Sequence, residues 1–387
     1  MLRRHRTLHS PRKKKKIVLI GPVYPYKGGI SHYTGMMYRE LAGRHEVDMI
    51  TYKMQYPRLL FRREQKDYKN DSFRVEKARY LLHTANPFNI IRTARQIRRQ
   101  KPDMVIIQWW HPYFAPCYRL LEQFMGRQNL VFVCHNVFPH ERFPLDRMLT
   151  RMVLKRGRHF IVHAREEGRE LESILAAPDY RVTPHPTYNM FLFEHLGREA
   201  ARERLQIAPG TKLLLFFGFV REYKGLRHLL RAMPLIAARL GGVRLMVVGD
   251  FDSDKESYVK LIGELGIGEL VQLVDGYIPD REVEKYFAAC DLTVLPYESA
   301  TQSGIVQIAF GFTKPVIVTD VGGLPEVVED GRTGYVVEPR NPEALADAVC
   351  RFYEEERQAE FEEQIRREAY RFSWERMGEV VDGFFTD

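Results

Sequence analysis

The chain has 387 residues, a length that accommodates two domains of ordinary size. Hydrophobic residues make up 45% of it, which is enough for complete cores and excludes a wholly disordered protein. Its net charge is +9, and its longest apolar run is about eight residues, at 213–220, whereas a membrane-spanning helix needs about 20. We therefore expect a globular protein that does not cross a bilayer.

The positive charge is concentrated at the start of the chain. Residues 1–16 contain eight Lys and Arg residues and no acid, so subtracting them from +9 leaves +1 for the rest. This stretch lacks the apolar segment of a signal peptide, and we expect a basic disordered tail. Such an arm suits an anionic lipid surface or nucleic acid, and a merely solvated tail is the alternative. The near-neutral remainder argues against nucleic acid as a partner.

Four cysteines, Cys117, Cys134, Cys290 and Cys350, are far apart in the chain and form no CxxC pair. This spacing predicts reduced thiols and no zinc site. A reducing compartment, the cytoplasm, follows as the expected location, with peripheral association at the inner face of the cytoplasmic membrane as a further expectation.

The first half of the chain alternates apolar runs with helical patterns. Short apolar runs predict buried strands at 17–20, 47–51, 104–109, 130–134 and 159–162. A helical pattern covers 87–100, and residues 53–86 indicate a loop plus a helix. Arg147, Arg151 and Lys155 recur at helical spacing, which suits either a membrane surface or an ordinary solvated helix face.

The loop after the first strand, GPVYPYKGGISHYTG, contains Gly28 and Gly29 just before an amphipathic run. Glycines at this place let a ligand or another backbone approach closely, although an ordinary turn would look the same. A GxGxxG fingerprint is absent, which counts against a nicotinamide or flavin enzyme.

Residues 183–200 break the alternation, with two prolines among residues of mixed polarity. The second half then restarts it, with strands expected at 212–217, 243–248, 270–274, 292–295, 316–318 and 334–337. We therefore predict a basic tail at 1–16, a Rossmann-like N-terminal domain at 17–190 on the acceptor side and a Rossmann-like C-terminal domain at 191–370. A helix at 371–387 is expected to end the chain and to be able to pack back on the N-terminal domain.

This order of elements indicates an α/β protein built from two doubly wound parallel sheets. Ligands of such sheets bind beyond the carboxyl ends of the strands. With two sheets in one chain, the expected binding site is the cleft between the domains.

Two helix starts in the second half suit a phosphate. The loop GFVREYKG places Arg221 and Lys224 beside a helix N-terminus, where the dipole disfavours cations, so a bound anion would explain them. A surface pair balanced by Glu222 is the alternative. Farther on, the polar loop 297–303 leads into a helix that opens at Gly304, whose free N–H groups and dipole favour an anion.

The order of these motifs resembles a known family. The stretches GFVREYKG, RLMVVGD, VDGYIPDREVEKYFAACDLTVLPY and QSGIVQIAFGFTKPVIVTDVGGLPEVVEDGRTGYVVEP resemble the retaining family 4 glycosyltransferases, which have the GT-B fold. The likeness is close over about 213–350 and looser in the N-terminal half. It implies an enzyme that moves a sugar from a nucleoside diphosphate to an acceptor.

The resemblance also implies residue roles. Arg221 and Lys224 would hold the donor diphosphate, the backbone of Ser303, Gly304 and Ile305 would meet its phosphates beside Gln302, and Gly276-Tyr277 would lie near the nucleobase. Gly28 and Gly29 would face the donor from the other domain. His135, in VCHNVFPHE, resembles the histidine that faces the transferred sugar, and a satisfied buried histidine is the alternative. Glu326 would either cap its own helix or contact the donor. His111, His163 and His185 also follow strands or precede a proline, and structural roles are expected for them.

One departure from the family pattern concerns its two glutamates, which are separated by seven residues. Alignment on Gly304 puts Thr301 and Ala309 at those positions, and Glu298 falls three residues early. A subgroup with TQSG at this place resembles the chain, and a non-catalytic member of the family is an alternative.

No metal and no other cofactor is expected, because cations and helix dipoles would neutralise the diphosphate. Asp252 and Asp254 lie near a strand end, but the resemblance gives them no metal role. The expected acceptor is a glycan or lipid-linked molecule of envelope or extracellular polysaccharide synthesis. Other classes left open are a nucleotide-sugar epimerase or phosphorylase of the same fold and a basic nucleic-acid-binding protein.

Overall fold

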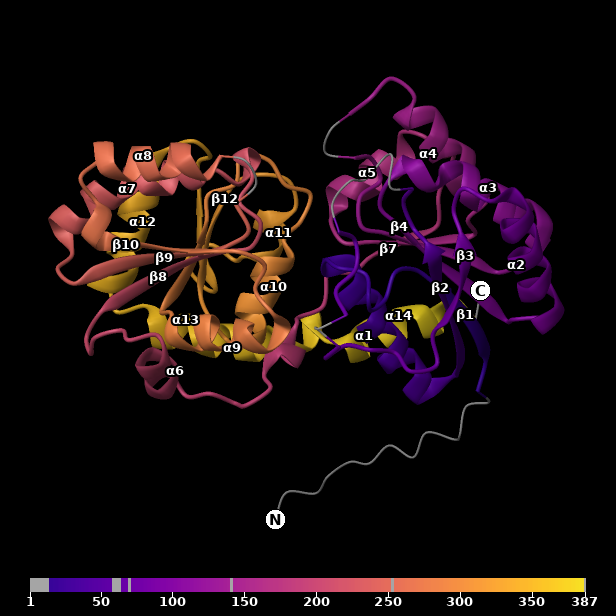
Figure 1. Cartoon of the computed structure of the whole chain (residues 1–387), viewed down its shortest axis with the longest axis horizontal. Coiled ribbons are helices and arrows are strands. Elements are labelled where there is room, and N and C mark those ends of the chain that lie inside the picture. The colour runs from indigo at the N-terminus through magenta and orange to yellow at the C-terminus, as the bar shows by residue number, and fades with distance from the viewer. Residues whose placement is uncertain (1–13, 58–63, 69–70, 140–141, 252–253, 386–387) are drawn as a thin grey trace, which may run out of the picture.

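The computed structural model describes residues 14–57, 64–68, 71–139, 142–251 and 254–385. These residues form two α/β lobes side by side, with the linker between them at the bottom of the view in Figure 1. The prediction of two doubly wound parallel sheets is confirmed. Most of the predicted tail, residues 1–13, lies outside the described residues, and Lys16 already belongs to the first strand.

The N-terminal lobe contains, among the described residues, a sheet of seven parallel strands in the order β3-β2-β1-β4-β5-β6-β7. Its strands are β1 (Lys16–Ile20), β2 (Glu46–Met54), β3 (Arg79–His83), β4 (Met104–Trp109), β5 (Leu130–Cys134), β6 (His159–Val162) and β7 (Tyr180–Val182). Its helices are α1 (Gly29–Arg44), α2 (Pro87–Gln100), α3 (Ala115–Met125), α4 (Asp146–Leu154) and α5 (Arg165–Glu172).

The C-terminal lobe contains, within the described part of the chain, a six-stranded parallel sheet in the order β10-β9-β8-β11-β12-β13. Its strands are β8 (Lys212–Phe217), β9 (Val243–Gly249), β10 (Val271–Asp275), β11 (Leu292–Leu295), β12 (Val316–Thr319) and β13 (Gly334–Val337). The helices of this half are α6 (Arg198–Arg204), α7 (Leu226–Arg239), α8 (Lys255–Glu264), α9 (Asp280–Ala289), α10 (Gly304–Gly311), α11 (Leu324–Val327), α12 (Pro342–Glu354), α13 (Gln358–Glu368) and α14 (Trp374–Gly383).

Two edge strands were missed by the sequence analysis. Residues 53–86 were expected to form a loop plus a helix, but their described part contains no helix and contributes β3. β7, which has three residues, was not predicted at all. Both strands lie at an edge of the sheet and leave part of their side chains in solvent, so neither shows the continuous apolar run of a central strand.

Two helices start in the same way, at an Asn-Pro pair. Asn86 caps α2 by accepting a hydrogen bond from the backbone N–H of Asn89 (3.0 Å), and Asn341 caps α12 in the same manner from Ala344 (2.9 Å). Proline follows each asparagine at the first helical position, where its missing N–H has no intrahelical partner to lose. This local chemistry is why the start of α2 could be placed correctly from sequence.

The last helix of the chain belongs to the N-terminal lobe. Figure 1 shows α14, in yellow, lying beside α1, in indigo, beneath the first sheet. Trp374, Met377 and Val381 are buried there in one core cluster with strand β1. The Trp374 indole packs edge-on against Tyr33 at 5.0 Å, and its N–H donates to the Thr187 carbonyl at 3.1 Å. The chain thus crosses between the lobes twice.

We expect Trp374→Ala to destabilise the N-terminal lobe by about 3–5 kcal/mol, because the change leaves a cavity between α14 and α1. The midpoint of urea unfolding, followed by circular dichroism, measures this loss. Phe88→Ala is the matched control, since Phe88 is 85% exposed and its removal should change stability by no more than about 0.5 kcal/mol. Equal midpoints for the two variants would show that α14 does not support this lobe.

Candidate functional site

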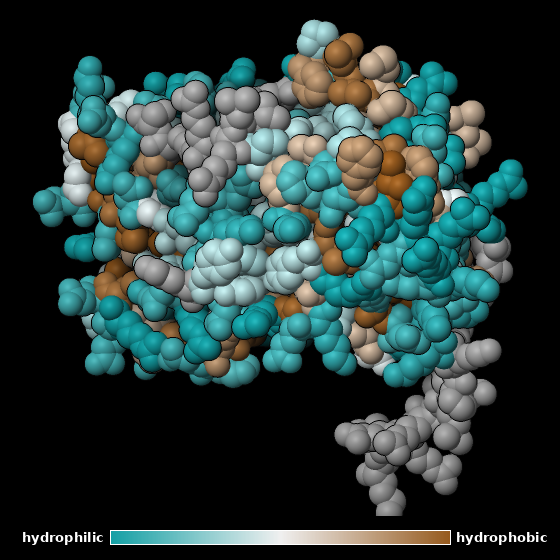
Figure 2. Space-filling model, turned by 45° about the vertical axis from the view of Figure 1, so that its right-hand side comes forward, coloured by the Kyte–Doolittle hydropathy of each residue, from teal (hydrophilic) through white to brown (hydrophobic). Residues whose placement is uncertain are grey.

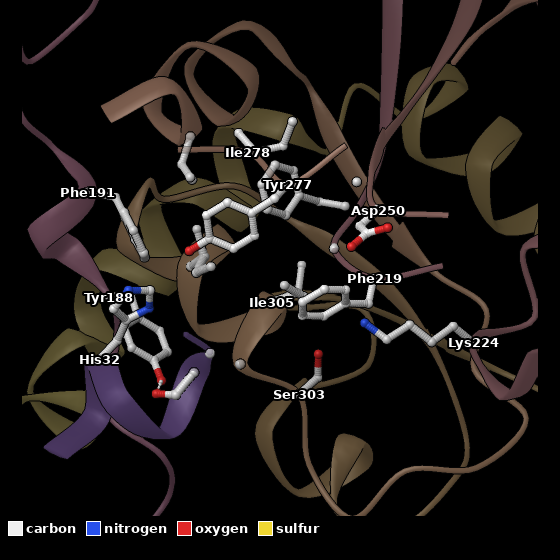
Figure 3. Close-up of a pocket in the computed structure, with 18 of the residues that line it drawn as sticks. His32, Tyr188, Phe191, Phe219, Lys224, Asp250, Tyr277, Ile278, Ser303 and Ile305 are labelled. Carbon is white, nitrogen blue, oxygen red and sulfur yellow. Dashed lines mark hydrogen bonds between the residues drawn. The ribbon is translucent and has the colours of Figure 1, made fainter. Parts of the chain in front are cut away.

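The carboxyl ends of both sheets meet at a cavity of about 300 Å³. Its walls come from the start of α1, the loops after β8, β9, β10 and β11, and the start of α10. Figure 3 shows side chains entering it from both lobes, with His32 and Tyr188 on one side and Lys224 on the other. This volume lies at the lower end of the range for sites that hold small molecules.

Most of the nominated binding residues line this cavity. They are Gly28, Gly29, Lys224, Gly276, Tyr277, Gln302, Ser303, Gly304 and Ile305. His135, Arg221 and Glu326 do not line it. The structure thus brings together nine residues that the sequence analysis selected from four separate segments of the chain.

Lys224 brings a buried positive charge to the cavity. Only 9% of the residue is exposed, and burial lowers the pKa of its ammonium group. Its Nζ lies 5.3 Å from the ring centre of Tyr297, and no carboxylate in the described residues forms an ion pair with it. A desolvated cation of this kind is stabilised by an anion that enters the cavity.

The start of α10 supplies a second element suited to an anion. Ser303 is the N-cap residue, is 8% exposed, and its hydroxyl lies 3.3 Å from that of Tyr297. The first turn of α10 carries no acidic residue. The positive end of its dipole therefore faces the cavity without a side-chain carboxylate to balance it. Figure 3 shows Ser303 and Lys224 directed at the same part of the cavity.

Two glycines let the loops after β8 and β9 pack directly against each other. A Cβ atom on Gly249 would lie 1.9 Å from the carbonyl oxygen of Gly218, and Gly249 has a φ of 151°. Gly218 itself lines the cavity. A Cβ atom added to it would lie 3.3 Å from Nζ of Lys224. The backbones of these two loops therefore touch directly and form this part of the cavity wall, and a side chain at Gly249 would force them apart.

Several lining residues were not nominated from sequence. Asp250, directly after β9, and Asp280, at the start of α9, bring carboxylates into the wall, and Asp280 is 2% exposed. Across the lobe boundary, Nε2 of His32 lies 3.3 Å from Oδ2 of Asp280. The position of Asp250 after a strand could have signalled it, whereas the approach of His32 to Asp280 joins residues 248 positions apart in sequence.

The loop before α10 also joins the two lobes. The Thr301 hydroxyl donates to Oδ1 of Asn136 (2.6 Å), and the Gln302 amide donates to the carbonyl of His135 (3.2 Å). Thr301, which occupies the first of the two family glutamate positions, therefore faces the N-terminal lobe. Ala309, at the second, is fully buried in the core of its own lobe.

Glu298 does not take the place of these glutamates. Its Oε1 lies 2.9 Å from Nε2 of His228, and its Oε2 accepts from Arg340 at 2.9 Å. Burial acts to raise the pKa of Glu298, but these two hydrogen bonds outweigh it and leave the pKa below its usual value. Both carboxylate oxygens are engaged outside the cavity.

His135 is buried and does not line the cavity. It is 4% exposed, its Nε2 lies 2.7 Å from Oε1 of Gln108, and burial lowers its pKa well below the usual value. His163 and His185 lie close by around the ring of Tyr33, and burial lowers their pKa values to about 4 and about 3. All three imidazoles are therefore neutral near pH 7. The burial of His135 agrees with the alternative that the sequence left open, whereas the grouping of the three rings around Tyr33 was not predicted.

The two other nominated residues lie elsewhere. Arg221 is half-buried and precedes the short helical turn Glu222–Lys224. Glu326 reaches across to the other lobe, where both of its oxygens accept from the backbone N–H of Arg165 at 2.9 and 3.0 Å, the first residue of α5. Glu326 thus caps a helix of the N-terminal lobe. The sequence had suggested that it would cap its own helix or contact the donor.

No cluster of three or more His, Cys, Asp or Glu side chains that could hold a metal ion occurs among the described residues. Asp252 lies outside those residues, and Asp254 is the N-cap residue of α8. All four cysteines are buried free thiols.

Solved structures with the same two-lobed arrangement define the fold as GT-B. Sucrose-phosphate synthase from Thermosynechococcus elongatus matches with a TM-score of 0.72 and 19% identity, covering 96% of this chain and 100% of that one. Anabaena HepE in complex with UDP matches with a TM-score of 0.74 and 18% identity, covering 96% and 99%. HepE has also been solved in complex with UDP-glucose.

Both lobes match models of glycosyltransferase domains. Residues 27–187 match Glycosyltransferase Family 4, and residues 211–355 match Glycosyl transferases group 1. The chain thus consists of a family 4 glycosyltransferase domain followed by a group 1 domain and belongs with the glycosyltransferases.

Curated relatives agree with this assignment over part of their length. D-inositol 3-phosphate glycosyltransferase 1 of Catenulispora acidiphila is 31% identical over 51% of this chain and 49% of that protein. The corresponding protein of Nocardia farcinica is 29% identical over 51% and 46%. The chain spans about half the length of the curated relatives it matches.

We predict that Glu298→Gln leaves the affinity for UDP within about twofold of the wild-type value, because Glu298 is held by His228 and Arg340 outside the cavity. Isothermal titration calorimetry measures that affinity. A small loss of stability, about 1 kcal/mol, is expected from the lost charge on a part-buried pair. A large fall in UDP affinity without loss of stability would instead assign Glu298 to the nucleotide.

Proposed function

We propose that this chain transfers a sugar from a nucleoside diphosphate to the hydroxyl of an acceptor, with retention of anomeric configuration. The observation that carries the proposal is the pairing of buried Lys224 with the N-terminus of α10 at one cavity between the lobes. A diphosphate is the ligand group that satisfies both, because it offers several anionic oxygens to a cation and to free N–H groups.

The donor lies, in this proposal, with its diphosphate between Lys224 and the start of α10. Tyr277 and Gly276, at the end of β10, are placed to border the nucleobase, and Gly28 and Gly29 approach from the other lobe. UDP is the first nucleotide to test, since HepE was solved with UDP and with UDP-glucose. We keep Arg221 as a proposed diphosphate contact on the flank of Lys224.

In the reaction, the bond from the sugar's anomeric carbon to the diphosphate oxygen breaks, and a bond from that carbon to the acceptor oxygen forms on the same face. The acceptor's proton passes to a phosphate oxygen of the leaving diphosphate. The protein contributes positioning and charge stabilisation, which are large terms in catalysis. Lys224 and the α10 dipole stabilise the charge that develops on the diphosphate, and we propose that no metal ion is required.

In this proposal, His135 positions another residue and does not itself contact the sugar. Its ring is held by Gln108, and its carbonyl accepts from Gln302, which lines the cavity. A neutral imidazole that fixes the strand end therefore sets where the Gln302 side chain lies. Direct contact between His135 and the transferred sugar would require the ring to leave its buried place.

We expect Lys224→Ala to weaken UDP binding by at least about tenfold, because a desolvated charge pair is lost. Arg221→Ala should weaken it to a smaller degree. Thermal shift and calorimetry with UDP measure both effects. Equal UDP affinities for wild type and Lys224→Ala would refute the assigned diphosphate site.

Product analysis separates the proposed activity from its alternatives. A glycosyltransferase releases UDP from UDP-glucose in proportion to acceptor consumed, and proton coupling at the anomeric carbon of the product reports retention. An epimerase of the same fold would yield an isomeric sugar, and a non-catalytic binding protein would yield no product despite a normal UDP affinity.

Association with an anionic membrane surface is a further part of the proposal and fits a lipid-linked acceptor of envelope synthesis. The described helices include none that is long and apolar enough to cross a membrane. The face in Figure 2 is mostly hydrophilic, with apolar side chains in small groups. Near α4, Leu145 and Met148 are 54% and 59% exposed beside the exposed basic residues Arg147 and Arg151.

The tail can be tested without disturbing the sheet. Lys16 begins β1 and its N–H donates to Asp103 at 2.7 Å, so a deletion should remove residues 1–13 only. That deletion removes five of the eight basic residues. We expect at least about tenfold weaker binding to vesicles containing phosphatidylserine, at about 1 kcal/mol per basic residue near the surface. Vesicles of phosphatidylcholine are the control, and unchanged binding would remove the tail's role.

A further inference from the structure

Among the described residues, two carboxylates line the cavity between the lobes, and they differ in what they contact. Asp280 is 2% exposed, and its Oδ2 lies 3.3 Å from Nε2 of His32. Asp250, directly after β9, is half-buried, and in the described part of the chain no hydrogen bond or ion pair engages its carboxylate. Figure 3 shows it on the side of the cavity that carries Lys224, across from His32. Asp250 is therefore the acid that a ligand in this cavity can meet.

Two neighbouring acids are already engaged within the protein. Asp275, the last residue of β10, accepts a backbone hydrogen bond through Oδ1 (3.2 Å), and its Oδ2 lies 2.9 Å from Nζ of Lys255. Glu222, in the loop after β8, lies 3.2 Å from a guanidinium nitrogen of Arg227. Asp250 differs from both, because a half-buried carboxylate without a partner lowers the stability of the protein without ligand. Hydrogen-bond donors on a bound ligand would offset that cost.

The order of the strands places Asp250 in the middle of the proposed nucleotide site. β9 lies between β10 and β8, and adjacent strands are about 4.8 Å apart. Beyond the strand ends, the N–H of Gly276 donates to the carbonyl of Gly249 (3.1 Å), and the N–H of Val220 donates to the carbonyl of Asp250 (2.9 Å). The three loops are thus fixed side by side. The loop of Asp250 lies between Gly276, placed to border the nucleobase, and the loop of Lys224, placed at the diphosphate. In a nucleotide the ribose joins these two parts, so it falls at the end of β9.

We propose that Asp250 accepts hydrogen bonds from the two hydroxyls of the donor's ribose and makes the site select ribonucleotides over deoxyribonucleotides. The inference rests on the proposed nucleotide site and deepens it. A carboxylate offers two acceptor oxygens, the ribose diol offers two neutral donors, and hydrogen bonds to an ionised acceptor are strong ones. A metal ion fits less well, because no cluster of three or more metal-binding side chains occurs in the described ranges. A nucleotide without the 2′-hydroxyl leaves one oxygen of the acid desolvated and unpaired, which lowers its affinity.

Calorimetry on the full chain compares UDP, GDP, ADP and CDP, each with its own 2′-deoxy form. For the nucleotide that binds most tightly, we expect the wild type to prefer the ribonucleotide by at least about tenfold. Asp250→Ala should bring this ratio to within about twofold of one, chiefly by weakening the ribonucleotide. The ratio is the measure because any repulsion between Asp250 and the diphosphate affects both members of a pair equally. The side chain of Asp250 has no partner among the described residues, so its removal should leave the melting temperature of the ligand-free protein unchanged.

Three further variants separate hydrogen bonding from charge. Asp250→Asn keeps one acceptor oxygen at nearly the same volume, and its ratio should lie between those of the wild type and Asp250→Ala. Lys224→Ala should weaken both members of a pair alike and keep the wild-type ratio, since it acts on the diphosphate. Glu222→Ala is the matched control, because it removes an acid that is paired with Arg227 and does not line the cavity. It should change neither affinity.

The outcomes distinguish failure of this inference from failure of the proposed function. A wild type that binds deoxy forms as tightly as ribonucleotides, or a preference that survives Asp250→Ala, overturns the role of Asp250 and leaves the proposed sugar transfer standing. A preference that falls equally with Glu222→Ala overturns it as well, as a general effect of charge. Failure of the wild type to bind any of these nucleotides overturns the nucleotide site itself and, with it, the inference.

Discussion

Contact between the polar loop that precedes α10 and the end of β5 is the interaction on which the site depends. Thr301 and Gln302 bond to Asn136 and to the backbone of His135, which joins the carboxyl edge of one parallel sheet to that of the other. The same loop ends at Ser303, where α10 begins. One short segment therefore sets both the closeness of the lobes and the direction of the helix dipole at the cavity.

The electrostatics of the cavity follow from which charges are paired inside the chain. Glu298 is held by His228 and Arg340, and Glu326 is held by the backbone of α5, so neither carboxylate is directed at Lys224. A buried ammonium group without a carboxylate is costly in the protein alone. Placing it beside an uncompensated helix N-terminus adds to that cost, and an anionic ligand offsets both. The site therefore lowers the stability of the protein without ligand and raises its affinity for an anion.

Sequence predicted the central strands well because burial on both faces leaves a continuous apolar run. The limits expected for the central strands β4, β5, β6, β8 and β11 agree with the structure, and so do those of the edge strand β13, whose residues are buried or half-buried. β3 and β7 were missed because both leave side chains in solvent and β7 has only three residues, so neither shows a continuous apolar run. A continuous apolar run therefore indicates a strand that is buried on both faces, and a strand without such burial gives no comparable signal.

The candidate site divides in the same way. Gly304 and Lys224 were found because local chemistry marks them: a glycine opens a helix, and a cation precedes one where it is disfavoured. His32, Tyr188 and Asp280 were not found, since they reach the cavity through the approach of distant segments. The capping of α5 by Glu326 also depends on how the lobes meet, which no local pattern encodes.

The departure from the paired family glutamates has a structural consequence within the same cavity. Thr301 is turned toward the other lobe and Ala309 is enclosed in a core, so α10 and its loop bring no carboxylate to the ligand space. The carboxylates that do line it come from the ends of neighbouring elements, Asp250 after β9 and Asp280 before α9. A subgroup defined by TQSG remains a prediction. The carboxylates of the cavity wall therefore lie on elements other than α10, and among the described residues none of them forms an ion pair with Lys224.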